Sequence, residues 1–435
     1  DKIGVEIELS ITDFGSFNQN TTLALSANEE IDVLACVGFP YATGIQQGYL
    51  SDLEENDLIQ TYGQGIIDAV GQENVDACRV NGVLYGLPSN RDIAQGRGCA
   101  AIATEYLDGI GYEANTDDEI VKISLDELND IYAQLHEKYP DKEVYRPTTG
   151  SMSQFSNVDS LGGNVFGVLL DYGQNLDVVN LFESDFYKDY CARLYDYNQK
   201  GYISADASTD TTAVGELVKA GTLMSYTTGG KPGIKAQETT LTGRDMTIFQ
   251  TLDDYISSTS VASMPWTIPI SAQHKEAAMK FLNECYTNAD IANLLAWGIE
   301  GTHYKIGDDG LATYADGVDA SNSGWNHSMG WMMPNQFLTH VWEGNDPDLW
   351  TEMKEFNTNA KVSKASGFSF DSTNVANELT AVQNVYNEYQ TSVEYGFVDP
   401  ETGIAEMNDK MMTAGLQKII DEKKAQLEAW QEANK

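Results

Sequence analysis

The chain has 435 residues, 42% of them hydrophobic and 10% aromatic, which is enough for two or three domains with real cores and excludes global disorder. Its 66 acidic residues outweigh 26 basic ones, so the formal net charge is −40. Such an acidic surface repels nucleic acid and anionic lipid headgroups, and we expect neither as a partner. Small neutral or cationic ligands remain compatible with this charge.

No membrane span, metal site or cofactor site is expected from the sequence. There is no apolar run of 18 residues. The five cysteines stand singly, without a CxxC pair, so we expect no metal and no redox centre. Cys36, Cys191 and Cys285 fall within apolar patterns typical of small core residues. The chain starts at Asp1 rather than at Met, which suggests that the natural N-terminus has been left out.

The first elements predict a sheet with a ligand-binding edge. Residues Val5 to Ile11 alternate in polarity like a strand, residues 18–28 resemble a short helix, and the apolar run Ile31 to Val37 predicts a buried strand. This order of strand, helix and strand predicts a parallel sheet. Gly38 then opens an aromatic loop with Phe39 and Tyr41. Open α/β sheets bind ligands at the carboxyl ends of their strands, so we expect a site at this loop.

A hairpin and a crossing segment are expected next. Asn81-Gly82 is a strong two-residue turn signal, and the strand after it is ended by Pro88. Residues 90–98 are polar and small, and they lead into an apolar strand at Cys99 to Ala103. A polar segment between two strands is a candidate crossing between lobes. Ser124 to Glu127 forms a capping box, which predicts the start of a helix.

The remaining chain predicts further helices and strands, with Asp399-Pro400-Glu401 as a turn. The apolar spacing between residues 412 and 430 is typical of an amphipathic helix. The elements expected from the patterns are a strand at 144–147, a helix at 178–197 ending at Lys200-Gly201, a turn leading into a strand at 220–226, an extended crossing at 264–270, a helix at 274–286 and a helical tail.

Catalytic patterns are missing from the sequence. It has no GxSxG, HExxH or P-loop motif, and its five histidines never fall at i,i+4. His327, beside Trp325, is either a polar contact in a cleft or an ordinary surface or core group. With 66 acidic residues, chance pairs of carboxylates are frequent, so no single pair indicates a glycoside hydrolase.

Aromatic residues at predicted loops, strand ends and crossings are the most informative feature. Sugar rings stack their apolar faces on aromatic side chains and hydrogen-bond to nearby polar groups. The alternative interpretation is that the tryptophans, Trp297 above all, only pack within the lobes. The residues in question are Phe39, Tyr41, Tyr226, Trp266, Trp325 and Trp331.

Several passages resemble the extracellular solute-binding proteins of carbohydrate-type ABC importers. They are EIDVLACVGFPYATGIQQGYLSDLEE, NGVLYGLPS followed by the strand at Cys99, and HKEAAMKFLNECYTNADIANLLAWGIEGTHY. The C-terminal stretches MGWMMPNQFLTHVWEGNDPDLWTEMKEFN, SGFSFD and AGLQKIIDEKKAQLEAW are similar to a C-terminal domain of unknown function in Gram-positive lipoproteins of this group. That family begins with a lipid-bearing cysteine, a linker, a strand and a helix, which are absent before Asp1.

The resemblance implies an α/β, two-lobed, type II periplasmic-binding-protein-like fold. Lobe one would comprise residues 1–90 plus 263–318, and lobe two residues 91–262 plus 319–435. A solute bound between the lobes would stabilise a closed state that docks on a membrane permease, while separate ATPase subunits drive uptake. The implied protein is a monomer, extracellular and lipid-anchored, and it is not an enzyme.

The resemblance also implies where the ligand-binding residues lie. Arg91 is a donor-only fork suited to hydroxyls or a carboxylate, and its alternative role is a salt bridge at the hinge. The expected positions are Gly38, Phe39 and Tyr41 at the mouth of lobe one, Asn90, Arg91 and Trp266 at the crossings, and Tyr226 with Trp325 or Trp331 on lobe two.

We therefore predict a protein that binds a sugar or an oligosaccharide. One alternative is a peptide or other small-solute binder of the same architecture. A secreted glycan-active enzyme is another, and it would need two carboxylates about 5–9.5 Å apart in one cavity. A cell-surface adhesin, without an enclosed cleft, is the third.

Overall fold

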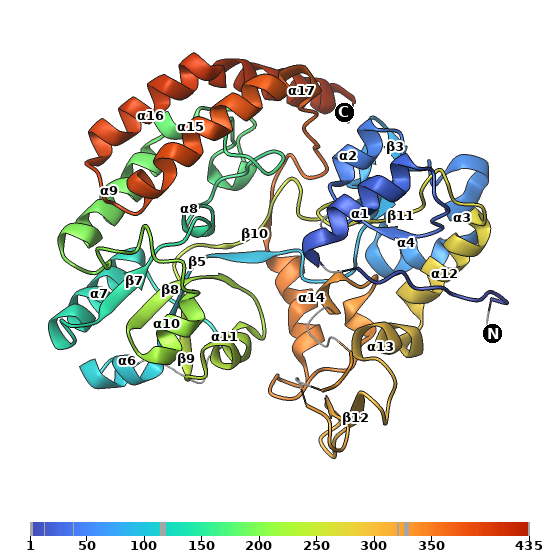
Figure 1. Cartoon of the computed structure of the whole chain (residues 1–435), viewed down its shortest axis with the longest axis horizontal. Coiled ribbons are helices and arrows are strands. Elements are labelled where there is room, and N and C mark those ends of the chain that lie inside the picture. Colours follow the sequence, from blue (N-terminus) through green and yellow to red (C-terminus); the bar gives the residue numbers. More distant parts are fainter. Residues whose placement is uncertain are drawn as a thin grey trace. The chain divides into compact units, whose positions relative to one another are not determined.

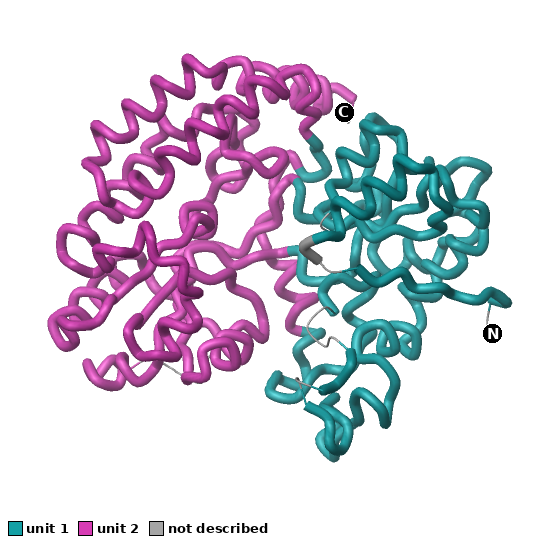
Figure 2. The backbone as a smooth tube through the Cα atoms, in the orientation of Figure 1, with its two compact units in different colours: residues 1–93, 259–351, 366–369 teal, residues 94–258, 352–365, 370–435 magenta. Residues whose placement is uncertain are grey.

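The chain forms two compact units, which Figure 2 shows in different colours. The computed structural model describes residues 3–12, 14–37, 39–113, 119–319, 322–325 and 330–433. Unit 1 comprises residues 1–93, 259–351 and 366–369, and unit 2 comprises residues 94–258, 352–365 and 370–435. Each unit has its own β-strands and its own helices (Figure 1).

Residues 319–351 belong to unit 1 in the structure, whereas the sequence placed them in lobe two. Hydrogen bonds explain the difference. The Asn335 side chain donates to the Tyr286 carbonyl at 2.7 Å, and the amide of Asn90 donates to the carbonyl of Pro334 at 2.8 Å. Both partners of this segment lie in unit 1, so it folds with that unit. Whether the units act as moving lobes stays a prediction.

The main sheet of unit 1 has three short strands in the order β1–β11–β4, and β2–β3 and β12–β13 form two separate two-stranded sheets. The central strand β11 runs antiparallel to both neighbours, so the predicted parallel sheet is wrong. The strands of unit 1 are β1 (Leu34–Ala35), β2 (Arg79–Val80), β3 (Val83–Leu84), β4 (Gly86–Leu87), β11 (Trp266–Thr267), β12 (Tyr304–Ile306) and β13 (Ala312–Tyr314).

Helices pack around this sheet and form its core. Side chains such as Ile59, Ile66, Met279 and Leu282 are at most 1% exposed and pack in one cluster, which burial of apolar surface stabilises. The helices are α1 (Phe14–Ser26), α2 (Tyr41–Gln46), α3 (Leu58–Tyr62), α4 (Gln64–Val70), α5 (Gln72–Asp76), α12 (Lys275–Thr287) and α13 (Ala289–Trp297). Helix α14 (Leu349–Asn359) begins in unit 1, and most of its residues belong to unit 2.

Three local predictions in unit 1 have different outcomes. The hairpin is confirmed: Asn81 and Gly82 both have positive φ, at 52° and 82°, and connect β2 to β3. The helix at residues 18–28 is confirmed as α1. The strand at Val5 to Ile11 is wrong, because the described chain supplies no strand that pairs with this extended segment.

Unit 2 is built on a larger mixed sheet. Strand β5 runs antiparallel to β8 on one side and to β9 on the other, while β7 is parallel to β8 and β6 is parallel to β9. Cys99 to Ala103 in β5 and Ile248 and Phe249 in β9 are at most 1% exposed. The strands are β5 (Gln95–Ala103), β6 (Val121–Lys122), β7 (Glu143–Arg146), β8 (Leu223–Gly230), β9 (Met246–Gln250), β10 (Asp254–Ile256) and β14 (Lys361–Val362).

Side-chain caps fix several helices of unit 2. The capping box is confirmed, since the Ser124 hydroxyl accepts from the Glu127 amide at 3.1 Å. The helix predicted at 178–197 starts only at Asp185, where Ser184 is the cap. Asp399 caps a helix instead of forming a turn. The helices are α6 (Thr104–Ile110), α7 (Leu125–Lys138), α8 (Ser151–Gln154), α9 (Asp185–Gln199), α10 (Val214–Ala220), α11 (Ile234–Thr242), α15 (Ala376–Glu394), α16 (Pro400–Ala414) and α17 (Leu416–Ala433).

Candidate ligand-binding site

One edge of the unit 1 sheet gathers several of the predicted site residues. Strands β1 and β4 both run antiparallel to β11, so they are parallel to each other and end at the same edge. Strand β11 begins at that edge with Trp266, whose Cα partners are Ala35 and Leu87. The predicted crossing therefore delivers an aromatic side chain to the carboxyl ends of two strands, where ligand sites of α/β sheets lie.

Trp266 is half-buried and held in a defined orientation. Its indole Nε1 donates to the carbonyl of Met332 at 3.2 Å, and its ring packs on the core cluster of unit 1. Trp331 precedes Met332 in the short helical turn Gly330–Met332 and is also half-buried. The Trp266 indole thus contacts the main chain of the residue that follows Trp331. This contact places two of the predicted aromatic residues near the same edge of the sheet.

Asn90 and Arg91 follow β4 at the same edge. Asn90 supports the backbone, because its amide nitrogen Nδ2 donates to Ala69 O at 3.1 Å and its own carbonyl accepts from the Gln336 amide. The Arg91 guanidinium donates to the carboxylate of Asp92 at 3.0 Å and to the Ser263 hydroxyl at 3.1 Å. This ion pair fits the alternative role weighed for Arg91, and a ligand contact by Arg91 stays a prediction.

Phe39 and Tyr41 lie in the core of unit 1. Phe39 is 1% exposed and packs in a cluster with Leu34 and Leu50. The Tyr41 hydroxyl donates to the Cys78 carbonyl at 2.7 Å, and burial raises the pKa of this phenol well above its usual value. Both rings are buried and offer almost no surface to a ligand, in contrast to their expected place at the mouth of a site. Gly38 lies outside the described residues.

Trp325 belongs to unit 1 and pairs with a histidine. Its ring stacks on that of His303, with centroids 6.0 Å apart and an interplanar angle of 29°. Gly298, with φ of 83°, approaches both rings: a Cβ there would lie 2.5 Å from His303 Nδ1 and 3.1 Å from Trp325 Cγ. His327 lies outside the described residues.

Tyr226 lies in β8 of unit 2 and is committed to a buried carboxylate. Its hydroxyl donates to Glu238, which also accepts from the Thr228 hydroxyl at 2.7 Å. Tyr226 is 3% exposed, and burial, together with the Glu238 charge, raises the pKa of its phenol. Thr227 and Thr228, the next residues of the strand, are half-buried and closer to its carboxyl end.

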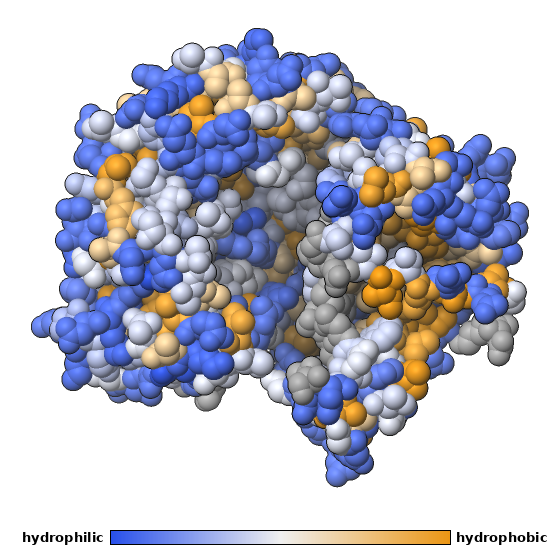
Figure 3. All heavy atoms as spheres, viewed as in Figure 1, coloured by the Kyte–Doolittle hydropathy of each residue, from blue (hydrophilic) through white to orange (hydrophobic). Residues whose placement is uncertain are grey.

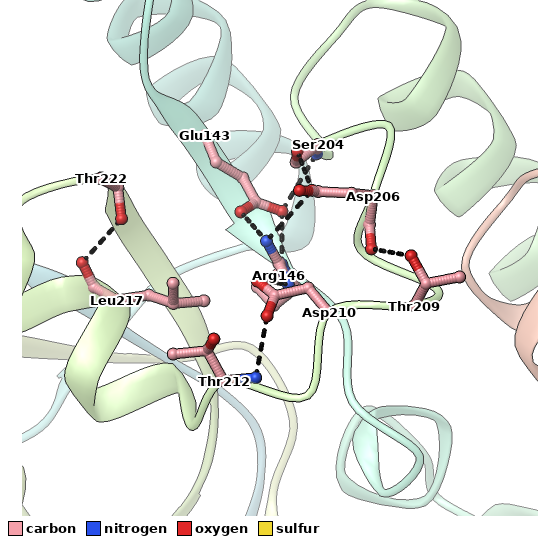
Figure 4. Close-up of polar contacts among 9 residues, drawn as sticks. All are labelled: Glu143, Arg146, Ser204, Asp206, Thr209, Asp210, Thr212, Leu217 and Thr222. Carbon is pink, nitrogen blue, oxygen red and sulfur yellow. Dashed lines mark hydrogen bonds and ion pairs between the residues drawn. The ribbon is translucent and has the colours of Figure 1, made fainter.

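A closed ion cluster surrounds Arg146 at the carboxyl end of β7 (Figure 4). The guanidinium lies between Glu143, with two bonds of 2.7 Å, and Asp210, at 3.1 Å. Glu143 also accepts from the Ser204 amide at 3.0 Å. Because these groups satisfy one another, the cluster orders the loop around residue 206 and has no evident place for a ligand.

Arg97 is a candidate site residue that the sequence reasoning missed. It lies in β5, and its main chain bonds to Leu252 and Asp253, directly after the end of β9. Its Nη1 donates to Ser153 O at 2.8 Å, but Nε is buried and has no partner among the described residues. Burial lowers the pKa of this guanidinium. The one sequence signal was its place in the polar crossing at 90–98.

The described residues give no sign of a metal centre or a membrane span. In that part of the chain, no three His, Cys, Asp or Glu side chains are grouped so as to hold a metal ion. No described helix is long and apolar enough to cross a bilayer. All five cysteines are buried and carry free thiols.

Comparison with known structures identifies the fold as the α/β, two-lobed fold of type II solute-binding proteins. The chain is similar to the crystal structure of the N-glycan transport solute binding protein NgtS from Streptococcus pneumoniae, with a TM-score of 0.86 and 23% identity, covering 100% of this chain and 94% of that one. It is also similar to an HMO-binding solute-binding protein from Bifidobacterium longum infantis, with a TM-score of 0.64 and 17% identity, covering 99% and 93%.

Sequence comparison points to the same group of proteins. The chain is 25% identical, over 98% of its length and 84% of the relative, to a carbohydrate ABC transporter substrate-binding protein of Streptococcus pneumoniae serotype 4. Residues 364–432 match a domain of unknown function, DUF3502. The resemblance inferred from the sequence motifs is thereby confirmed, including its C-terminal domain, and these relatives are transport proteins.

Proposed function

We propose that this chain is the extracellular solute-binding subunit of an ABC importer and that it captures a sugar or an oligosaccharide. The observation that carries the proposal is the match along almost the whole chain to a carbohydrate transporter's substrate-binding protein. The fold agrees with it, and two of its structural relatives are NgtS bound to Man1GlcNAc and to Man5GlcNAc.

The site chemistry supports a carbohydrate. Trp266 presents a ring whose orientation is fixed by the bond from its Nε1 to Met332 O, so stacking on it costs little side-chain entropy. Polar groups of Arg91 and Ser263 lie after and before the strands at the same edge. An aromatic face with a few fixed donors is the usual composition of a small-molecule site.

Capture would work by hinge closure. A ligand that makes more contacts in a closed state than in an open state favours the closed state, by the difference in contact free energy between the two. The closed form would then dock on the membrane permease. We further propose that the protein acts as a monomer, without catalysis, at the outer cell surface and held there by a lipid anchor.

The test is a thermal-shift screen over a defined panel. It contains neutral mannose–N-acetylglucosamine oligosaccharides, milk-type oligosaccharides, the corresponding monosaccharides and mixed tripeptides. A ligand that binds only the folded protein, at 100 times its Kd, adds about 2.7 kcal/mol of stability. We expect an oligosaccharide to give the largest shift. Shifts from peptides alone would overturn the sugar assignment, and turnover of a bound glycan would show an enzyme instead.

Substitution of the site tryptophans tests the location of binding. Trp266→Leu and Trp331→Leu keep apolar volume but remove the ring face, so the affinity for the active oligosaccharide should fall about tenfold, or about 1.4 kcal/mol. Titration calorimetry measures this.

Trp350→Leu is the matched control. Trp350 is also half-buried in unit 1 and its Nε1 also donates to a carbonyl, that of Thr339 at 2.7 Å. The Trp350→Leu variant should bind the active oligosaccharide with the affinity of the wild type. If all three variants bind as the wild type does, Trp266 and Trp331 serve only in packing.

A further inference from the structure

Arg97 of unit 2 has a donor edge that the protein itself does not use. Of its two terminal nitrogens, Nη1 donates to Ser153 O at 2.8 Å, whereas Nη2 makes no bond to a described residue. Nε is buried and also has no partner among these residues. Nε and Nη2 point along the same edge of the planar guanidinium, so they form a fork of two parallel donors.

The carboxylate whose charge acts on Arg97, that of Asp159, does not fill this fork. Asp159 is fully buried and its charge favours the charged guanidinium, yet its carboxylate already accepts four hydrogen bonds. The donors are the Leu161 amide at 3.0 Å, the Tyr255 hydroxyl at 2.8 Å, and the Ser258 amide and hydroxyl at 2.8 and 2.6 Å. Within the described part of the chain, no carboxylate forms an ion pair with Arg97.

The guanidinium is nevertheless held in place. Its Cζ lies 5.7 Å from the centre of the Tyr255 ring, and Tyr255 in turn packs edge-on against Tyr172. The Tyr172 hydroxyl accepts from the Asp253 amide at 2.9 Å, which fixes that ring. A rigid cation with an unused fork is costly to maintain, because a buried donor without a partner loses about 1–3 kcal/mol.

Arg97 lies at the edge of the unit 2 sheet where the parallel strands end. Strands β6, β7, β8 and β9 run parallel to one another, with β5 antiparallel between β8 and β9. Gly96 is paired with Gly230, the last residue of β8, so Arg97 lies at the carboxyl edge of all four strands. This is the edge at which α/β sheets bind their ligands.

We propose that Arg97 is a ligand-binding residue of unit 2 and that its Nε/Nη2 edge binds two adjacent hydroxyl oxygens of a saccharide. The inference rests on the proposed carbohydrate function. A carboxylate has the same pair of acceptors, but the net charge of −40 repels anionic ligands at long range, so neutral sugars are favoured over uronates.

Two substitutions at Arg97 test the proposal. Arg97→Gln removes the charge and the fork, and Arg97→Lys keeps the charge but not the fork. The ligand is the neutral oligosaccharide that raises the melting temperature of the wild type in the screen. Titration calorimetry should show that both variants bind it at least about tenfold more weakly than the wild type. Without ligand, Arg97→Gln should melt at or above the wild-type temperature, because an unpaired donor is removed.

Arg244→Gln is the control with the same change in charge. Arg244 pairs with Glu105 at the opposite end of the sheet, just before β9, so its variant should bind the sugar within about twofold of the wild type. The panel also includes a glucuronate-containing oligosaccharide of equal length.

The possible outcomes separate the two proposals. If no saccharide binds the wild type, the proposed function fails and the sugar assignment of Arg97 with it. If the sugar binds wild type and Arg97 variants equally, or if Arg97→Gln only lowers the melting temperature, the inference alone is overturned. Tighter binding of the glucuronate would overturn the choice of hydroxyls over a carboxylate.

Discussion

At the scale of single residues, Arg146 and Arg97 show two uses of a buried guanidinium. Arg146 forms ion pairs with Glu143 and Asp210, so its charge is neutralised within the protein. Arg97 has an aromatic support and one carbonyl partner, and its Nε and Nη2 donors have no partner among the described residues. The first arrangement contributes to local order, and the second suits recognition.

Glu394 gives a pH-dependent term at this scale. It is 1% exposed, and its carboxyl group accepts from the hydroxyls of Tyr386 at 2.7 Å and Tyr187 at 3.1 Å and from the Gln390 amide at 3.1 Å. Burial raises the pKa of Glu394 to about 7, although these bonds lower it. The neutral form is therefore favoured by folding.

The raised pKa of Glu394 determines how stability changes with pH. The folded protein holds the Glu394 proton up to about pH 7, whereas the unfolded chain releases it near pH 4.5. The stability from this group is present below pH 4.5 and is lost as pH rises to about 7. Glu394→Gln should therefore gain stability relative to the wild type over this window, by roughly 3 kcal/mol.

Urea unfolding of both proteins between pH 4.5 and 8 measures the difference in free energy of unfolding. All other titrating groups are common to the two proteins and cancel in that difference. A difference that does not change with pH would contradict the assignment to Glu394.

The position of a residue in the fold could be predicted from the sequence where the backbone pattern decides it. Trp266 lies in an extended stretch that had to cross the sheet, and it is found at a strand start. Phe39 and Tyr41 follow an apolar run in the same way, but contacts with Leu50 and Cys78, distant along the chain, place them in the core. The unused donors of Arg97 appear only once its three-dimensional partners are known.

At the scale of elements, helix α17 is tied to a distant loop by one lysine. The Lys423 side chain is fully buried, and its ammonium donates to the carbonyls of Ser160 at 2.8 Å and Gly167 at 2.9 Å and to Asn164 Oδ1 at 3.0 Å. These oxygens belong to a loop that precedes α17 by more than two hundred residues. The contact joins the C-terminal domain to the rest of unit 2.

Replacing this lysine should loosen the loop. Lys423→Met keeps the apolar stem but leaves several buried oxygens without a donor, so the free energy of unfolding should fall by about 3 kcal/mol. Lys424→Met is the control, because Lys424 is the next residue and is exposed. Chemical denaturation at pH 6 compares the two, and equal losses would contradict the role of Lys423.

Element prediction depended on whether the deciding signal was local. The Ser124 cap and the Asn81-Gly82 turn are local, and both are confirmed. The start of α9 was misplaced because Val179 pairs with Val168 before Ser184 caps the helix. Alternation from Val5 to Ile11 predicted a strand, but a strand also needs a neighbour, which alternation alone does not supply.

At the scale of the whole molecule, charge and surface character agree. The net charge is −40, and hydrophilic residues cover most of the face in Figure 3, with hydrophobic residues in separate patches. Such a charge favours solubility and rejects polyanions, and it carries no information on the fold. The fold class came from the resemblance of whole passages, since periodicity alone predicted only α/β elements.

The distribution of cysteines permits a test at this scale. Cys36, Cys78 and Cys285 lie in unit 1, and Cys99 and Cys191 lie in unit 2. All are at most 3% exposed, so an alkylating reagent should modify none of them in the native protein. In rising urea, peptide mass spectrometry should show the thiols reacting in these two groups if each unit opens cooperatively. Simultaneous modification of all five would contradict independent opening.

The same arrangement turns the thiols into built-in reporters of conformational fluctuation. Each unit carries its own thiols, which react only when the interior of that unit is exposed to solvent. None of these sulfurs takes part in the proposed recognition of sugar, so a bound saccharide should slow their alkylation without changing the intrinsic reactivity of the thiols. The decrease in alkylation rate in each unit would then show how strongly ligand binding stabilises that unit.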